Sequence, residues 1–409
     1  MPPHLIPSHR NRPSDDPIFS LHQEANRRKE SGETIVDATI GVLLGEDGQL
    51  AILPTAARAV REVHEAEWAA YAPIAGTPEF RRAVIDDLLA DAPDLRACAV
   101  AVATPGGSGA LRHAIVNFLE PGQAALTASW YWSPYKTLCD ESDRRLETFE
   151  MFSATGSFDV AGLDAAIGRQ LATQGRSLVF VNDPAHNPTG YSLTDEEWHA
   201  IVESIASRAA SGPVTLLVDG AYMLYGPRSA RSLAARLLPL AGTAAVLFAW
   251  SASKSYTHYG LRVGALVACL ADDRERARVE AALSYSCRGT WSNCNRGGLV
   301  AITRLLVDPS AARSCTAERD HLKATLLARV DLFNRLARER GLHYPRYDGG
   351  FFVTVFVDRA LERAASMAKR GIYVVPQVLA SGRGALRVAL CALASRDVPR
   401  LVEALSDAT

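Results

Sequence analysis

The chain lacks the features that mark membrane proteins, secreted proteins and nucleic-acid-binding proteins. Its apolar runs stay far below the roughly 20 residues that a membrane helix needs, and the best of them, AAVLFAW, covers only residues 244–250. The N-terminal segment MPPHLIPSHRNRPSDDP has no apolar core of a secretory signal. The formal net charge of -1 argues against nucleic acid or an anionic membrane as a partner. We therefore expect a soluble protein.

Cysteines are few and follow no recognisable pattern. The seven residues are an odd number, and no two of them have the CxxC spacing. Such a distribution fits neither a disulfide framework nor a zinc site. The sequence therefore predicts no metal centre and a place in the reducing cytoplasm. The residues are Cys98, Cys139, Cys269, Cys287, Cys294, Cys315 and Cys391.

The composition, with 48% hydrophobic and 22% charged residues, is that of an ordinary globular protein. Short apolar runs alternate with longer amphipathic stretches, which is typical of an α/β protein with a mainly parallel sheet flanked by helices. One expected helix begins at Thr194, which forms a capping box with Glu197. The expected strands of the sheet cover residues 97–103, 123–129, 177–183, 214–220, 244–250 and 262–270.

At 409 residues the chain exceeds the usual size of one domain. After residue 270 long helical stretches run to about residue 340, and FFVTVFVD and GALRVALCAL then read as strands of a smaller α/β unit. We predict an N-terminal arm at 1–14, a small domain from 15–50 and about 310–409, and a large domain at 51–309.

The segment TPGGSGALRH follows the first expected strand and opens a helix. Glycines such as Gly107 let the backbone approach an anion, and Ser108 with the free N–H groups of a helix start would hold a phosphate. A plain strand-to-helix turn has the same pattern. A dinucleotide site would also need GxGxxG, which is absent.

Two further polar groups stand at strand ends. Asn187 of HNPTG could donate a hydrogen bond to a ring oxygen. Asp219 of VDGAY emerges from an apolar strand and needs a cationic partner, which a protonated pyridine nitrogen would supply, and Tyr222 follows three residues later. Taken singly, an ordinary β-turn and a helix cap are the alternatives.

The fourth group is SASKSYTHYGLRVGAL, in which Lys254 follows an apolar strand. A lysine that is partly desolvated near a cation loses its proton more easily than its free pKa of about 10.4 implies, and it can then attack an aldehyde. Ser251, Ser253 and Arg262 add phosphate-binding groups around it. A solvated surface lysine is the alternative.

Taken in this order, the four groups resemble the class I aminotransferases of pyridoxal-phosphate (PLP) fold type I, in particular the aspartate and aromatic aminotransferase branch. The likeness covers nearly the whole chain: DPIFSLHQEANRR, the IGV of TIGVLLGEDGQ, YAPIAGTPEF, PGGSGALR, SW at 129–130, HNPTG, DGAY, SASK with RVGAL, and GALRVAL. The resemblance implies pyridoxal 5'-phosphate as cofactor. It also implies ping-pong transfer of an amino group from an L-amino acid of aspartate or aromatic type to a 2-oxo acid, and a homodimer with shared active sites.

The resemblance also implies roles for single residues. Lys254 would carry the cofactor as a Schiff base and move the substrate proton, and Asp219 would hold the pyridinium proton. Asn187 and Tyr222 would bond the phenolic oxygen, while Trp130 would stack on the ring. The phosphate contacts implied are Gly107, Ser108, Ser251 and Arg262, with Tyr71 from a neighbouring subunit.

For the substrate, Arg387 matches the arginine that binds the α-carboxylate as a bidentate pair. Arg383 is a nearby competitor, and Ile40 with Gly41 would line the substrate side. Arg288 aligns with the arginine by which dicarboxylate-specific members bind the distal carboxylate from the second subunit, but it could equally be an exposed residue at a helix end.

The chain departs from the close family near the pyridine-binding aspartate. Ser133 stands where that family has a histidine behind the aspartate, and the stretch with Asn182 and Asp183 differs too. These changes put assignment to aspartate itself in doubt. Two other functions stay open: another PLP reaction on the same scaffold, such as that of a lyase, synthase or oxidase, and a cofactor-binding module of a transcription regulator. The second is disfavoured because the chain has no basic surplus and no room for a DNA-binding domain.

Overall fold

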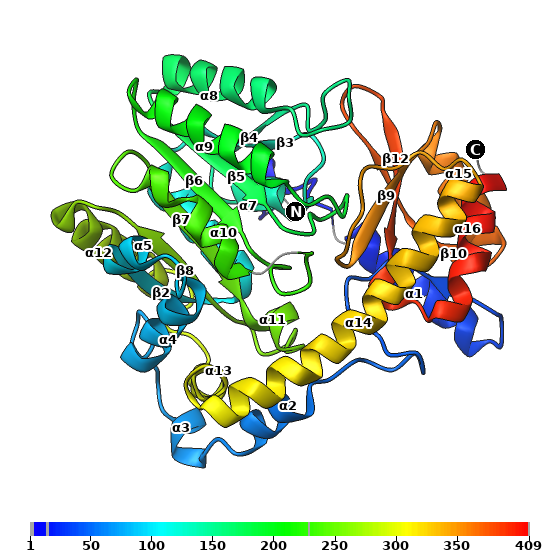
Figure 1. Cartoon of the computed structure of the whole chain (residues 1–409), viewed down its shortest axis with the longest axis horizontal. Helices are drawn as coiled ribbons and strands as arrows, with labels where there is room; N and C mark the ends of the chain where they lie inside the picture. The colour runs from blue at the N-terminus through cyan, green and yellow to red at the C-terminus, as the bar shows by residue number, and fades with distance from the viewer. Residues whose placement is uncertain (1–3, 14–15, 228–229, 408–409) are drawn as a thin grey trace.

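A computed structural model describes residues 4–13, 16–227 and 230–407. Its main element is a seven-stranded sheet with the order β2-β8-β7-β6-β5-β3-β4 (Figure 1). The pairs are parallel except those of β8, which runs antiparallel to both β2 and β7. The strands are β2 (Ala99–Pro105), β3 (Ala124–Ala128), β4 (Arg145–Phe149), β5 (Ser177–Asn182), β6 (Val214–Asp219), β7 (Ala245–Ser251) and β8 (Val263–Cys269).

Helices cover both faces of this sheet, because the central strands are apolar on both sides. All six residues of β6, VTLLVD, are buried. Leu217 packs toward the face covered by α6, α7 and α12, while Leu216 and Val218 pack toward the face covered by α4, α8, α9 and α13. The helices are α2 (Pro54–Arg61), α3 (Glu65–Ala69), α4 (Pro78–Leu88), α5 (Pro93–Ala97), α6 (Gly106–Phe118), α7 (Pro134–Asp140), α8 (Val160–Gln174), α9 (Asp195–Ala209), α10 (Ala230–Arg236), η2 (Leu238–Leu240), α11 (Ala252–Ser255), α12 (Asp273–Arg288) and α13 (Arg296–Val307).

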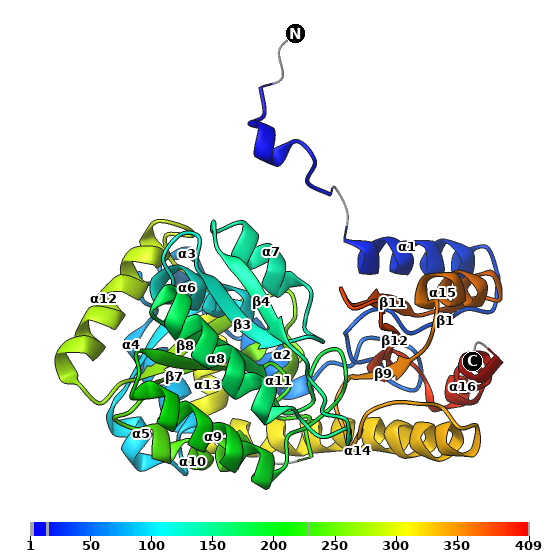
Figure 2. The same cartoon turned by 90° about the horizontal axis from the view of Figure 1, so that it is seen from above.

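A second, smaller α/β region lies at the other end of the molecule from the large sheet (Figure 2). It has its own core, in which Val330, Phe333 and Val355 are buried. It contains an antiparallel sheet of order β11-β12-β9 and a short parallel pair of β1 with β10. The N-terminal helices η1 (Pro7–His9) and α1 (Pro17–Glu30) precede this region in the chain. Its elements are β1 (Val36–Asp37), β9 (Phe352–Phe356), α15 (Ala360–Lys369), β10 (Ile372–Tyr373), β11 (Val375–Val378), β12 (Gly384–Ala389), η3 (Leu390–Ala392), η4 (Ser395–Asp397) and α16 (Val398–Asp407).

The long helix α14 (Pro309–Glu339) joins the two regions. Its first half packs on α2 and α13, and its second half packs on α16, as both views show. The predicted boundary near residue 310 coincides with the start of this helix, but the domain limits stay a prediction. Residues 1–3 and 14–15 of the predicted arm and small domain lie outside the described residues.

The structure confirms the predicted α/β class, the six expected strands and the capping box of Thr194 with Glu197. The prediction missed β4, whose residues are mostly half-exposed, and the short strands β1, β10 and β11. The helices of the described residues include none that is long and apolar enough to cross a membrane. Within the same residues no group of three or more side chains is arranged to hold a metal ion, and all seven cysteines are free.

Candidate active site

Polar side chains gather at the carboxyl ends of the parallel strands. Asn182 and Asp219 are paired neighbours at the ends of β5 and β6, and Lys254 follows the end of β7. The ends of parallel strands meet at one edge of a sheet, where an open α/β protein binds its ligands. We call the set around them the strand-end group; it comprises Trp130, Asn187, Asp219, Tyr222, Lys254, Arg262 and Arg387.

Lys254 is partly buried on the short helix α11. Its Nζ lies 5.5 Å from the centre of the Tyr222 ring. Burial lowers the pKa of Lys254 and Arg262 lowers it further, while the negative charge of Asp219 acts in the opposite direction. The amino group therefore loses its proton more easily than an exposed lysine does, which is what a nucleophile or a base requires.

Asp219 is buried and held in one orientation. Its Oδ2 accepts a hydrogen bond of 2.6 Å from the Tyr135 hydroxyl, and its Oδ1 accepts one of 3.1 Å from the N–H of Ala221. Asn182 fixes the backbone, because its Nδ2 donates to the Asp219 carbonyl at 2.8 Å. Burial raises the pKa of Asp219, and the bond from Tyr135 opposes that rise.

Asn187 is oriented by the residues before and after it. Its N–H donates to Asn182 Oδ1 at 2.7 Å, and its side-chain Nδ2 donates to the Tyr222 hydroxyl at 3.3 Å. The next residue, Pro188, follows a cis peptide bond, and its carbonyl accepts a hydrogen bond of 2.9 Å from Thr354 on β9. Burial raises the pKa of Tyr222, so this phenol stays protonated at neutral pH.

The start of α6 lies so close to Arg262 and to β8 that positions 106 and 264 have no room for a Cβ. A Cβ at Gly106, where φ is +73°, would lie 2.6 Å from Arg262 Nη2, and one at Gly264 would lie 2.5 Å from the Gly106 carbonyl carbon. Arg262 is fixed by its own donations to the carbonyls of Tyr259 at 2.9 Å and Pro105 at 3.3 Å. Several groups that can bind a phosphate lie at this contact. They are the start of α6 with Gly107 and Ser108, the hydroxyls of Ser251 and Ser253, and the guanidinium of Arg262. Together they can hold a phosphate.

Arg387 reaches the group from β12 and is only 4% exposed. Its Nη2 donates to the Thr39 carbonyl, and its guanidinium lies 4.6 Å from the centre of the Phe352 ring. Among the described residues its Nε has no hydrogen-bond partner, and neither has the buried Nε1 of Trp130. No carboxylate of these residues forms an ion pair with Arg387, and burial lowers its pKa. Two buried donors without partners are available to an anionic ligand.

The other predicted residues lie outside the strand-end group. The Arg383 side chain is 48% exposed, and its guanidinium pairs with Glu150 at 3.4 Å. Tyr71 is 87% exposed, and Arg288 is exposed with its guanidinium bonded to Ser292. Across the described residues, no hydrogen bond or ion pair joins Tyr71 or Arg288 to the strand-end group within one chain. Gly41 lies near Arg387, since a Cβ there would meet the Phe352 ring at 2.5 Å; Ile40 precedes it.

The sequence interpretation missed two residues of the site. Tyr135, rather than Ser133, contacts Asp219, and Phe352 lies under Arg387. Tyr135 follows Trp130 by five residues in the aromatic run WYWSPYK, which is a weak signal for it. Phe352 lies in an apolar strand, where nothing in the sequence separates it from core residues.

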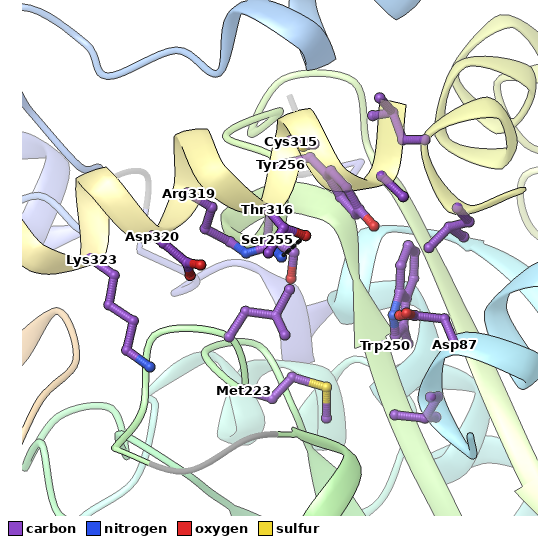
Figure 3. A pocket seen from close by; sticks show the side chains of 15 residues that line it. Asp87, Met223, Trp250, Ser255, Tyr256, Cys315, Thr316, Arg319, Asp320 and Lys323 are labelled. Atoms are coloured by element: carbon purple, nitrogen blue, oxygen red, sulfur yellow. Dashed lines mark hydrogen bonds between the residues drawn. The ribbon is translucent and has the colours of Figure 1, made fainter. Parts of the chain in front are cut away.

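A cavity of about 430 Å³ lies beside α11 and α14 (Figure 3). Its lining includes Ser255 and Tyr256, which directly follow Lys254, and the charged side chains of Arg319 and Lys323 on α14. Arg319 already donates to the Ser255 carbonyl at 3.4 Å. The cavity is not lined by Lys254 or Asp219, so we assign it no part in the chemistry.

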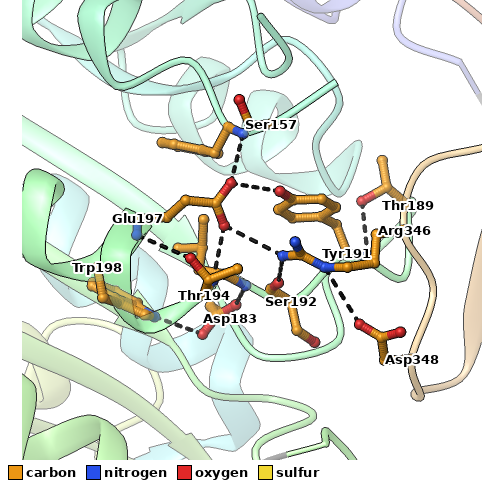
Figure 4. A network of polar contacts seen from close by, with 12 residues as sticks. Ser157, Asp183, Thr189, Tyr191, Ser192, Thr194, Glu197, Trp198, Arg346 and Asp348 are labelled. Atoms are coloured by element: carbon orange, nitrogen blue, oxygen red, sulfur yellow. Dashed lines mark hydrogen bonds and ion pairs between the residues drawn. The ribbon is translucent and has the colours of Figure 1, made fainter. Parts of the chain in front are cut away.

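A second polar set, the paired cluster, consists of the buried Asp183, Tyr191, Glu197 and Trp198 and the exposed Arg346 (Figure 4). Glu197 accepts hydrogen bonds from Tyr191 at 2.5 Å and from the N–H groups of Phe158 and Thr194 at 2.8 Å each, and it pairs with Arg346 at 3.3 Å. Asp183 accepts bonds from Trp198 at 2.9 Å and from the N–H of Leu193 at 2.7 Å. The unusual Asp183 therefore belongs to this cluster and not to the strand-end group.

Comparison with known proteins gives consistent matches over the whole chain. The model of the family "Aminotransferase class I and II" matches residues 33–405. The chain is 28% identical over 409 residues to an aromatic-amino-acid aminotransferase of Escherichia coli (strain K12), covering 96% of this chain and 97% of the relative. It is similar to the crystal structure of an aminotransferase from Anaerococcus prevotii, with a TM-score of 0.92, 30% identity and 99% of each chain covered. It is also similar to an aromatic-amino-acid aminotransferase from Burkholderia pseudomallei covalently bound to pyridoxal phosphate, with a TM-score of 0.81, 25% identity and 98% of each chain covered.

Proposed function

Since the chain belongs to the class I and II aminotransferases, we propose that the strand-end group is its active site. The protein is a PLP-dependent transaminase that transfers the amino group of an L-amino acid to a 2-oxo acid. The observation that carries the site assignment is that a lysine of lowered pKa, a buried carboxylate and phosphate-binding groups lie at the ends of the strands. In addition, the buried Arg387 forms no ion pair with a carboxylate among the described residues.

The residues present fit PLP. The glycine start of α6, Ser251 and Arg262 suit its phosphate, Asp219 suits its protonated ring nitrogen, and Asn187 with Tyr222 suits its phenolic oxygen. When bound, PLP withdraws the electrons left at the substrate Cα after proton loss and stores the amino group between the two half-reactions.

Lys254 supplies the nucleophile and the base. Because its pKa is lowered, a larger share of its amino groups is neutral near pH 7. A neutral Nζ would hold the cofactor through its aldehyde carbon and would take the proton from the substrate Cα. Asp219 and Arg262 act on the charge of Lys254 in opposite senses. The same two side chains that would hold the cofactor therefore also set how readily Lys254 moves a proton.

Arg387 is proposed to bind the substrate α-carboxylate. A planar guanidinium can make two parallel hydrogen bonds to a carboxylate, and the free Nε of Arg387 together with the free Nε1 of Trp130 supplies the donors. Such a clamp fixes the substrate relative to Lys254, which contributes through orientation. Arg383 is less suited, because its guanidinium is exposed and already paired with Glu150.

We further propose a homodimer in which Tyr71 and Arg288 serve the active site of the neighbouring subunit. Both lie on the surface, and Tyr71 stands next to other exposed apolar side chains, Trp68 at 60% and Ile74 at 40%. Exposed apolar side chains gathered in one stretch mark a contact surface. In that arrangement Arg288 would favour substrates with a distal carboxylate.

The test of the active site is Lys254→Ala beside Lys323→Ala. Lys323 is also partly buried with a pKa lowered by burial, but it lies outside the strand-end group. We expect Lys254→Ala to abolish the absorbance change on adding PLP. The rate of transamination of aspartate, tyrosine or glutamate should fall by about 10²- to 10⁴-fold. Lys323→Ala should behave as the unaltered protein. Release of ammonia or sulfide instead of a second amino acid would favour the alternative, another PLP reaction on this scaffold.

The shared site is tested by subunit mixing. Lys254→Ala and the double variant Tyr71→Ala/Arg288→Ala should each be weakly active alone. If the sites are shared in a two-fold dimer, equal mixing restores about a quarter of the unaltered activity, because half of the dimers carry one intact site. No recovery after subunit exchange, or a monomer by light scattering, would contradict the dimer. If Arg288→Ala alone selectively loses activity toward dicarboxylic 2-oxo acids, that result would support the role of Arg288 in binding the distal carboxylate.

A further inference from the structure

Tyr135 is enclosed so that its hydroxyl has a single direction. Its ring meets Phe180 edge-on with centroids 5.2 Å apart, meets Trp132 at 5.7 Å, and stacks on Tyr131 at 6.5 Å. The side chain is 1% exposed, and its hydroxyl donates to Asp219 Oδ2 at 2.6 Å. Packed rings on several sides fix the rotamer of Tyr135, so the hydrogen bond to Asp219 is built into the fold.

The bond joins residues 84 positions apart in the chain, from α7 to the end of β6. Asp219 faces three titratable groups from different elements: Tyr135 on α7, Tyr222 after β6, and Lys254 on α11. Tyr135 is the one that donates a hydrogen bond to the carboxylate from a side chain. A donor at this distance stabilises the charged form of a buried carboxylate, which desolvation would otherwise disfavour.

We propose that Tyr135 is a positioning residue for the cofactor, which keeps Asp219 ionised and in one rotamer for the protonated ring nitrogen. The inference rests on the proposed function, because it needs Asp219 to be the partner of that nitrogen. Burial and the neighbouring Asp219 raise the pKa of Tyr135 well above 10, so the phenol stays neutral at any working pH. A histidine in that role, with an ordinary pKa of about 6.5, would change charge near neutrality; this chain has Ser133 where the resemblance expects the histidine.

The inference is tested by binding to apo-protein, independently of turnover. Pyridoxine 5'-phosphate has the phosphate and the ring nitrogen but an alcohol in place of the aldehyde, so it forms no covalent link to Lys254. We expect Tyr135→Phe to weaken its binding by about ten- to a hundredfold, the effect of losing a hydrogen bond to a charged group. Binding of inorganic phosphate should not change. The control is Tyr131→Phe, which alters the stacked ring next door without touching Asp219 and should leave both affinities unchanged.

A spectroscopic measurement separates positioning from mere packing. The ultraviolet absorbance of bound pyridoxine 5'-phosphate reports whether its ring nitrogen is protonated. In Tyr135→Phe the nitrogen should lose its proton roughly one to two pH units lower than in the unaltered protein. In a double-mutant cycle, Tyr135→Phe should add little once Asp219→Asn is present, since both changes remove the same interaction. Additive losses would contradict the proposal.

The outcomes distinguish this inference from the proposed function. If the unaltered protein binds pyridoxine 5'-phosphate and Tyr135→Phe matches Tyr131→Phe in affinity and in absorbance, the role of Tyr135 is refuted and the active site stands. If the unaltered protein binds neither PLP nor pyridoxine 5'-phosphate, the proposed function fails and the inference fails with it. Should Tyr135→Phe lose its far-ultraviolet circular dichroism, the decision rests on Asp219→Asn, which should lose affinity for pyridoxine 5'-phosphate and keep affinity for phosphate.

Discussion

The strand-end group and the paired cluster are both polar and largely buried, but they differ in how their polar atoms are paired. In the paired cluster, Glu197 accepts three hydrogen bonds and pairs with a guanidinium. In the strand-end group, the Nε of Arg387 and the Nε1 of Trp130 have no hydrogen-bond partner among the described residues. A buried polar atom without a partner costs stability, and a bound substrate would supply the partner that these two donors lack. The difference separates a part that holds the fold from a part that binds a ligand.

Two buried arginines show the same contrast. Arg329 on α14 is completely buried, and it donates to Glu46 at 2.9 Å, to the Leu44 carbonyl at 2.9 Å and to the Cys391 carbonyl at 3.2 Å. Arg387 donates to one carbonyl and forms no ion pair with a carboxylate among the described residues. Burial lowers its pKa, although the charge of Asp16 acts to raise it. A buried arginine by itself therefore does not indicate a substrate site. A buried guanidinium that forms no ion pair with the described residues does.

Breaking the strand-end group should give the largest effect on activity. We expect Arg387→Met to lower kcat/KM for amino acids by roughly 10²- to 10⁴-fold, since removing one partner of a buried charge pair costs about 3–5 kcal/mol. The melting temperature of the apo-protein should stay equal or rise, because the variant removes a buried charge that has no carboxylate partner. Steady-state kinetics and calorimetry measure the two. A large fall in apo-protein stability would contradict the contrast with Arg329.

The reverse result is expected for the paired arginine. Arg329→Met should lower the free energy of unfolding by about 2–4 kcal/mol, because two carbonyls and the Glu46 carboxylate lose their donor. Per folded molecule, kcat/KM should change by less than about threefold, the ordinary scale of a change remote from a site. Denaturant unfolding with active-site titration checks both numbers. A selective rise in KM would show that Arg329 also serves the substrate.

In the paired cluster, Glu197→Gln should lower the free energy of unfolding by about 1–3 kcal/mol at pH 7 with little effect on kcat. Burial raises the pKa of Glu197, but the bonds from Tyr191, Thr194 and Phe158 outweigh it and hold that pKa below the ordinary value of 4.5. A carboxyl with a depressed pKa stabilises the fold above its unfolded pKa and loses that contribution as pH falls through its folded pKa. The difference between the two proteins should therefore narrow below about pH 4.5. A constant difference at all pH values would contradict the charge of Glu197 as the cause.

The smallest expected effect comes from Thr194→Ala at the start of α9. Thr194 accepts a bond from the N–H of Glu197 at 3.1 Å, and Glu197 accepts one from the N–H of Thr194, which completes a capping box. Losing such a cap costs about 1 kcal/mol. Thermal unfolding measures the loss, and Thr173→Ala is a control, because Thr173 is exposed and bonds only to the Arg169 carbonyl of its own helix. Equal shifts in the two variants would remove the cap as the explanation.

The sequence predicted most of the large sheet, because its central strands are continuous apolar runs such as VTLLVD. It missed β4, since RLETF lies at the edge of the sheet and carries charged residues among half-buried ones. The residues proposed for the cofactor were found from their order along the chain. The contact of Tyr135 with Asp219 could not be found in this way, because it depends on how α7 packs against the large sheet.

The choice between Arg383 and Arg387 shows the same limit. The two residues are four positions apart, and the sequence left both as candidates for the α-carboxylate. In the structure, Arg383 is half-exposed and paired with Glu150, whereas Arg387 is buried on β12. Burial and pairing come from the tertiary fold, so no local pattern could have separated the two arginines.

The most direct test of the central claim identifies the residue that carries the cofactor. The protein is loaded with PLP, reduced with borohydride so that the cofactor stays fixed to the amino group that holds it, digested, and mapped by mass spectrometry. The account predicts the added phosphopyridoxyl mass on the peptide that contains Lys254 and on no other lysine, and its loss in Lys254→Ala. The label on another lysine such as Lys323, or no label at all, would contradict it.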